Sequence, residues 1–119
     1  MDTMTIEREP GSSPDMTIFH LKGPFVLGTM FEFQNTLRDP EVKGVIVDLS
    51  EVPYIDSAGL GTILSHWAHT QRSGHKFALT GVSPRIDVLL EMTKVNTVLP
   101  MFKTAEDADQ SFTGQSAKA

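Results

Sequence analysis

The fold is decided by the stretch GVIVDLS at residues 44–50, followed shortly by YIDSAGLG at residues 54–61. A nearly continuous apolar run that ends in a carboxylate is typical of a strand buried on both faces, as in parallel sheets. Further along, apolar residues recur at helical spacing, and Asp56 or Ser57 is placed to act as the N-cap of that helix. This stretch therefore predicts a buried strand that leads into an amphipathic helix.

The flanking segments predict further strands and helices around this pair. We expect strands at residues 3–9, 15–21, 45–49, 75–80 and 98–102, and helices at 29–38 and 57–72, after the Ser83-Pro84 cap and after Thr104. The first two strands would pair as a hairpin, and strands separated by helices need right-handed crossovers. The predicted fold class is α/β: a mixed, mostly parallel sheet of about five strands with about four helices and an antiparallel N-terminal edge.

Length and composition limit the classes of protein to consider. A chain of 119 residues suits one domain, expected at residues 4–112 with a flexible tail at 113–119. The net charge of −5 argues against a nucleic-acid partner, and the absence of cysteine excludes a disulfide framework. No apolar run reaches the roughly 18 residues of a membrane span. We therefore expect a cytoplasmic protein with no membrane span.

Ser57 carries the strongest functional signal. A hydroxyl at a helix N-terminus, where backbone N–H groups favour negative charge, could carry a phosphate. Capping alone explains Asp56 or Ser57, but Gly59 and Gly61 each disfavour a helix by about 0.8–1 kcal/mol relative to alanine. Either close packing against the sheet or close approach of another molecule must offset that cost.

Two segments carry a family resemblance. Residues 45–61 (VIVDLSEVPYIDSAGLG) and 79–93 (LTGVSPRIDVLLEMT) resemble a STAS domain, and within that family the stand-alone anti-sigma factor antagonists of bacteria. The resemblance extends from about Met4 to Phe112. It implies a mixed sheet with helices packed around it, as the element order also predicts.

The resemblance implies a partner-switching regulator of transcription and signal transduction, not an enzyme. The serine that matches Ser57 is phosphorylated by a cognate anti-sigma factor, itself an ATP-dependent serine kinase, and a metal-dependent serine/threonine phosphatase resets the switch. No catalytic residue, cofactor or metal is expected. The expected partner-binding residues are Asp56, Ser57, Ala58, Gly59, Leu60 and Gly61, with structural support from Asp48, Ser83 and Pro84.

One segment departs from the family pattern. Many members carry an acidic segment before the first helix, whereas residues 23–28 here (GPFVLG) contain no carboxylate. Phe31 and Phe33 cannot both face the core, although burial statistics favour Phe31 as partly covered core. A stressosome-like, chemoreceptor-linked or lipid-transport partner is therefore an alternative to the anti-sigma factor kinase.

Rival classes fit the residues less well. A receiver domain would be phosphorylated at Asp48, but it needs Mg²⁺ held by a set of further carboxylates near the end of the first strand, and no such set follows Ile6 or Phe19. A serine hydrolase would need the first glycine of G-x-S-x-G before Ser57, and a nucleotide-binding enzyme would need a glycine-rich phosphate loop. His66 and His69 lack the third ligand that a zinc site requires, so we expect solvated or partly packed histidines.

Overall fold

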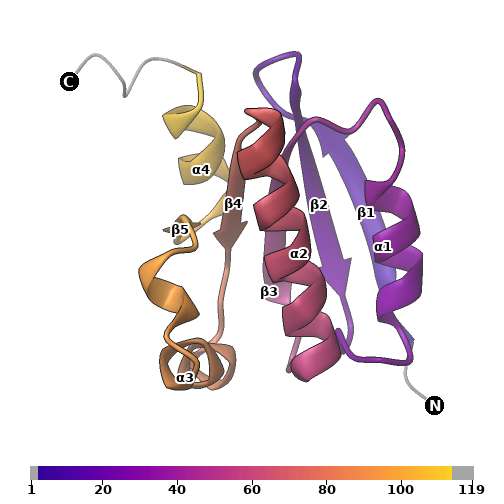
Figure 1. Ribbon diagram of the computed structural model, residues 1–119, viewed down its shortest axis with the longest axis vertical. Coiled ribbons are helices and arrows are strands. Elements are labelled where there is room, and N and C mark those ends of the chain that lie inside the picture. Colours follow the sequence, from indigo (N-terminus) through magenta and orange to yellow (C-terminus); the bar gives the residue numbers. More distant parts are fainter. Residues whose placement is uncertain (1–2, 114–119) are drawn as a thin grey trace.

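The structure, a computed structural model, describes residues 3–113 (Figure 1). The strands are β1 (Thr5–Pro10), β2 (Met16–Lys22), β3 (Gly44–Glu51), β4 (Phe77–Thr80) and β5 (Met101–Phe102). The helices are α1 (Met30–Leu37), α2 (Ser57–Ser73), α3 (Pro84–Met92) and α4 (Ala105–Ser111), with a 3-10 turn at Val95–Thr97. The predicted tail at 113–119 lies outside the described residues, except for Thr113.

The five strands form one sheet in the order β1-β2-β3-β4-β5. β1 pairs with β2 antiparallel, as the predicted hairpin requires, and the remaining pairs are parallel. The mixed, mostly parallel α/β fold predicted from the sequence is confirmed. The antiparallel edge also excludes the all-parallel sheet of a receiver domain.

Helices lie on both faces of the sheet, but they cover them unequally. Alternate residues of β3 point to opposite faces: Val45, Val47 and Leu49 join the large core with α1, α2 and α3, whereas Ile46 joins a smaller cluster against α4. Figure 1 shows α1 and α2 side by side in front of the sheet. Because α4 has only seven residues, it covers one end of the second face. On β2 and β3, His20 and Asp48 share this second face with Ile18 and Ile46.

Local signals set most helix ends. Asp56 and Ser83 cap α2 and α3 as predicted, each accepting a hydrogen bond from an N–H three residues later. Thr104 caps α4 in the same way. Gly74 ends α2 in a left-handed conformation with a φ of 75°. The sequence therefore predicts the residues at which these helices begin and the residue at which α2 ends.

Two sequence-based expectations are wrong. The strand expected at 98–102 pairs only over Met101–Phe102, because the chain enters the 3-10 turn through Lys94, whose φ is +66°. Phe31, expected as partly covered core, is 56% exposed, while Phe33 is buried between the rings of Phe19 and Phe25. Helix α1 therefore presents one aromatic side chain to the core and the other to solvent.

Candidate functional site

The loop before α2 is held against the loop between β2 and α1. The backbone of Phe25 pairs with that of Ile55 in an isolated parallel bridge, and the N–H of Phe25 donates to the carbonyl of Tyr54 over 3.1 Å. These backbone contacts therefore fix the position of the loop that leads into the first turn of α2.

Asp56 joins both segments with its two carboxylate oxygens. Oδ1 accepts from the N–H of Gly59 at 2.9 Å, and Oδ2 accepts from the N–H of Leu27 at 3.1 Å. Burial raises the pKa of this carboxyl, but hydrogen bonds from the N–H groups of Gly59, Leu27 and Ala58 together lower it by more. The net shift of the pKa is therefore downward. Asp56 is therefore an ionised cap at neutral pH.

Ser57 is the first residue of α2, and its side chain is exposed. It follows the charged Asp56 directly and lies where helix N–H groups point outward. An exposed hydroxyl in this position is accessible to the active site of another protein. The requirement that Ser57 be on the surface is met.

The other predicted partner-binding residues differ in exposure. Ala58 is half-buried, Gly59 and Leu60 are buried, and Gly61 is exposed. A Cβ at Gly59 would collide with the carbonyl oxygen of Phe25, so packing within the chain accounts for that glycine. A Cβ at Gly61 would meet nothing within 4 Å. Gly61 is therefore the glycine that the described packing leaves unexplained.

The predicted supporting residues lie at two different places. Ser83 and Pro84 begin α3, with the Ser83 hydroxyl accepting from the N–H of Ile86 at 3.2 Å. Asp48 lies on the face of the sheet opposite α2, where it accepts from the Ser50 N–H and from the Thr80 hydroxyl, both at 3.2 Å. Ser50 belongs to β3 and Thr80 to β4, so these bonds connect residues of the sheet and do not reach the loop at 52–56 that leads to Ser57.

Asp48 also takes part in a charged cluster that the sequence did not indicate. His20 Nδ1 lies 2.7 Å from Asp48 Oδ2, and His20 Nε2 lies 2.6 Å from Glu9 Oε2. Burial lowers the pKa of His20, but the two carboxylates raise it more, so the net shift is upward. Asp48, the residue that a receiver domain would phosphorylate, therefore has a structural role here as a partner of His20.

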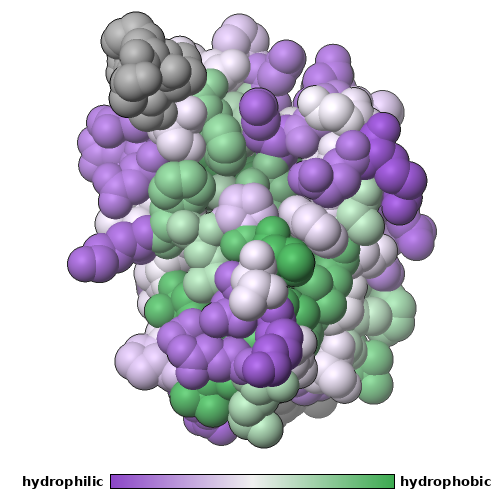
Figure 2. All heavy atoms as spheres, turned by 60° about the vertical axis from the view of Figure 1, so that its left-hand side comes forward, coloured by the Kyte–Doolittle hydropathy of each residue, from purple (hydrophilic) through white to green (hydrophobic). Residues whose placement is uncertain are grey.

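Apolar side chains lie next to the residues that precede Ser57, and sequence analysis did not single them out. Leu27, whose N–H bonds to Asp56, is 58% exposed. A groove of about 230 Å³ runs between Ile55, two residues before Ser57, and α3. Figure 2 brings the α3 side forward and shows apolar side chains gathered there, among which Val88 and Met92 are 54% and 75% exposed. The sequence signal that could have indicated this apolar surface was the leucine in the GPFVLG segment, which contains no charged residue.

Within residues 3–113, no group of three or more His, Cys, Asp or Glu is arranged to hold a metal ion. No helix in this described part of the chain is both long and apolar enough to cross a membrane.

Comparison with known proteins identifies the family. The STAS domain model matches residues 8–108. The anti-sigma F factor antagonist of Paenibacillus polymyxa is 22% identical over 77 residues, which cover 65% of this chain and 66% of that protein, just under two thirds of its length.

Solved structures agree on the fold. An anti-sigma factor antagonist from Mycobacterium paratuberculosis superposes with a TM-score of 0.78 at 16% identity, covering 91% of this chain and 92% of that one. The phosphorylated form of the Bacillus cell fate determinant SpoIIAA superposes with a TM-score of 0.70 at 14% identity, covering 90% of this chain and 99% of that one. Since the family model spans most of its residues, the chain belongs to the STAS domain family.

Proposed function

We propose that this STAS domain, predicted at residues 4–112, is an anti-sigma factor antagonist-like partner-switching regulator controlled by phosphorylation of Ser57. Its partners are a cognate anti-sigma factor serine kinase and a metal-dependent serine/threonine phosphatase. The observation that supports this most is the exposed Ser57 hydroxyl beside the ionised Asp56 at the start of α2. The protein acts as a substrate and binding partner, not as a catalyst, in the cytoplasm where such a kinase finds ATP.

The physical effect of phosphorylation follows from the charges already present. A phosphate on Ser57 adds about −1.5 to −2 charges beside Asp56. Asp56 already accepts the N–H of Gly59, so the phosphate competes with a carboxylate for the positive end of the helix. Because the Ser57 side chain is exposed, the modification changes the surface and requires no rearrangement of the core.

The surroundings of Ser57 explain why a partner would respond to this charge. Leu27, which bonds to Asp56, and the α3 groove beside Ile55 supply apolar contact area close to a neutral hydroxyl. A partner that covers these side chains would also remove water from Ser57. Desolvating a dianion without a matching cation is costly, so phosphorylation releases the partner.

Affinity capture with three baits tests the proposal. The wild-type protein and Ser57→Ala should both retain an anti-sigma factor serine kinase from a lysate of the source organism, whereas Ser57→Asp should not. Mass spectrometry identifies the retained protein, and incubation with ATP should phosphorylate only the wild type. Equal retention of the kinase by all three baits would remove the gating role of Ser57.

A non-sigma partner is the second candidate, and the segment before α1 favours it. Residues 23–28 supply no carboxylate, and the exposed side chains there and in α1 include Leu27 and Phe31. An apolar surface in place of an acidic one suits a partner with a different contact face, such as a stressosome-like, chemoreceptor-linked or lipid-transport protein. Retention of such a protein by the wild-type bait, with no kinase, would support this alternative.

A further inference from the structure

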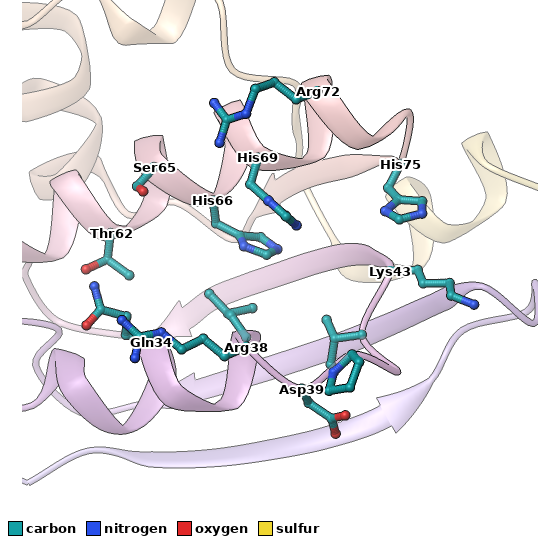
Figure 3. Close-up of a pocket in the computed structure, with 13 residues that line it drawn as sticks. Gln34, Arg38, Asp39, Lys43, Thr62, Ser65, His66, His69, Arg72 and His75 are labelled. Atoms are coloured by element: carbon teal, nitrogen blue, oxygen red, sulfur yellow. The ribbon is translucent and has the colours of Figure 1, made fainter.

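A second polar region lies between α1 and α2, away from Ser57. It is a pocket of about 530 Å³ formed by the end of α1, the turn at residues 38–43 and the middle and end of α2 (Figure 3). Small-molecule sites typically measure about 300–1,000 Å³, so the pocket has the volume of a ligand site. Its lining residues come from segments that only the tertiary fold brings together.

The pocket is rich in cationic side chains. Arg38, Lys43 and Arg72 line it, although the whole chain has a net charge of −5. The acidic residue among the described lining residues is Asp39, whose carboxylate lies 3.6 Å from the guanidinium of Arg8. Within residues 3–113, the ion pairs under 4 Å involve none of the three pocket cations. The pocket therefore favours an anionic ligand.

His66 provides the second observation. Its side chain extends from α2 toward the turn after α1 in Figure 3, it is 9% exposed, and its buried Nε2 has no hydrogen-bond partner in the structure. Burial, with a smaller contribution from the charge of His69, lowers the pKa of His66 to about 4, so the ring is neutral at pH 7. Leaving a buried polar group unpaired is unfavourable, because its lost bonds to water are not replaced. A ligand oxygen that accepts from Nε2–H would remove that cost.

The rest of the lining suits an apolar body. Leu37 and Val42 are buried at the pocket, and Pro40 lies beside them. The rings of His66 and His69 have centroids 5.4 Å apart and are tilted by 31°, so two imidazole faces border the same space. Aliphatic and ring surfaces inside a cationic rim match a molecule that carries a charge on an aromatic ring.

We propose that the pocket between α1 and α2 binds a small aromatic anion, with the ring against His66, His69 and Val42 and the phosphate or carboxylate group beside Arg38. His66 lies nine residues after Ser57, about 13 Å along the helix axis. The pocket is thus separate from the proposed phosphorylation site, and the test of ligand binding does not depend on the proposed function.

NMR titration of the ¹⁵N-labelled full-length chain tests the proposal with matched probes. Phenyl phosphate and benzoate carry a ring and a charge, inorganic phosphate carries the charge alone, and phenol carries the ring alone. Saturable shifts of Ser65, His66 and His69 are expected with phenyl phosphate or benzoate, at an affinity at least tenfold above that of phenol or inorganic phosphate. The two ring-bearing anions distinguish a phosphate ester from a carboxylate.

Three variants assign the contacts. Arg38→Gln should weaken binding of the better anion at least fivefold, whereas Lys103→Gln, which removes the same charge outside the pocket lining, should change it less than twofold. His66→Phe keeps a ring but removes Nε2, and should weaken binding at least threefold while the spectrum remains that of a folded protein. No saturable binding of either aromatic anion, equal binding of phenol, or equal effects of Arg38→Gln and Lys103→Gln would overturn the proposal.

Discussion

The two ends of α2 carry chemistry of different kinds. At the start of the helix, Asp56 and Ser57 act through local geometry: a cap, a helix N-terminus and an exposed hydroxyl. In its second half, His66 and Arg72 line a pocket together with Arg38 and Lys43, which belong to the turn after α1. The first region is defined by neighbours in sequence, and the second by neighbours in space.

The largest effect should distinguish two serines of the same helix. Ser57→Asp should weaken binding of the kinase on the order of 100-fold, or about 2.8 kcal/mol, because it places a second negative charge beside Asp56 within the contact surface. Ser65→Asp adds the same charge to an exposed position two turns later and should change affinity less than threefold. Isothermal titration calorimetry measures both. Comparable losses in the two variants would mean that net charge, not position, controls binding.

The next effect concerns the packing beneath the site. Gly59→Ala should lower the free energy of unfolding by about 1–3 kcal/mol, because the added Cβ collides with the Phe25 carbonyl. Helix propensity alone predicts the opposite sign, a gain of about 0.8–1 kcal/mol. Urea denaturation decides between the two. A more stable Gly59→Ala protein would show that the backbone at Phe25 can move away from the added Cβ at little cost in free energy.

In the second half of the helix, pH reports on His66. Its folded pKa of about 4 lies below its ordinary value of 6.5, so between these values the unfolded chain binds more protons. The contribution of His66 to stability is therefore complete above pH 6.5 and is lost as the pH falls toward 4. His66→Phe should flatten this part of the stability profile, while His69→Phe should retain most of it because burial is the first cause. An NMR midpoint for His66 near 6.5 would contradict the assignment.

A smaller effect tests the cap of α2. Asp56→Ala should cost about 1 kcal/mol, because the N–H groups of Gly59 and Leu27 lose their acceptor. The folded pKa of Asp56 is lowered, so its ionised form stabilises the fold above the unfolded value of about 3.9, and this is lost as the pH falls through the folded pKa. The difference between the wild type and Asp56→Asn should close at acidic pH. A difference that persists unchanged at pH 2 would exclude the charge as its source.

The smallest effect separates a partner-facing glycine from a packing glycine. Gly61→Ala should stabilise the free protein by about 0.8–1 kcal/mol, since its Cβ meets nothing within 4 Å. It should nevertheless weaken kinase binding, if close approach is what Gly61 provides. Thermal unfolding and calorimetry on the same sample measure both quantities. Unchanged affinity would remove Gly61 from the contact surface.

Sequence analysis predicted the elements whose signals are local. The apolar run of β3, the Asp56 cap and the Gly74 end of α2 all depend on residues within a few positions. The strand expected at 98–102 failed for the converse reason. Its apolar residues suit a strand, but β4 offers partners to Met101 and Phe102 alone, and the left-handed Lys94 directs the preceding residues into a 3-10 turn.

The candidate site was predictable in part. Ser57 and Asp56 follow from capping and from the family resemblance, whereas the separate roles of Gly59 and Gly61 require the position of the Phe25 carbonyl. His66 was expected to be solvated or partly packed. Its burial depends on packing against Phe77 and the turn after α1, which no helical periodicity encodes.

The most direct test of the central claim is site-resolved phosphorylation by the anti-sigma factor kinase identified with the wild-type bait. Incubation with ATP, followed by mass spectrometry of the intact protein and its peptides, should find one phosphate, located on Ser57. That phosphate should be absent from Ser57→Ala and present in Ser65→Ala. A phosphate on another residue, or full modification of Ser57→Ala, would contradict the account.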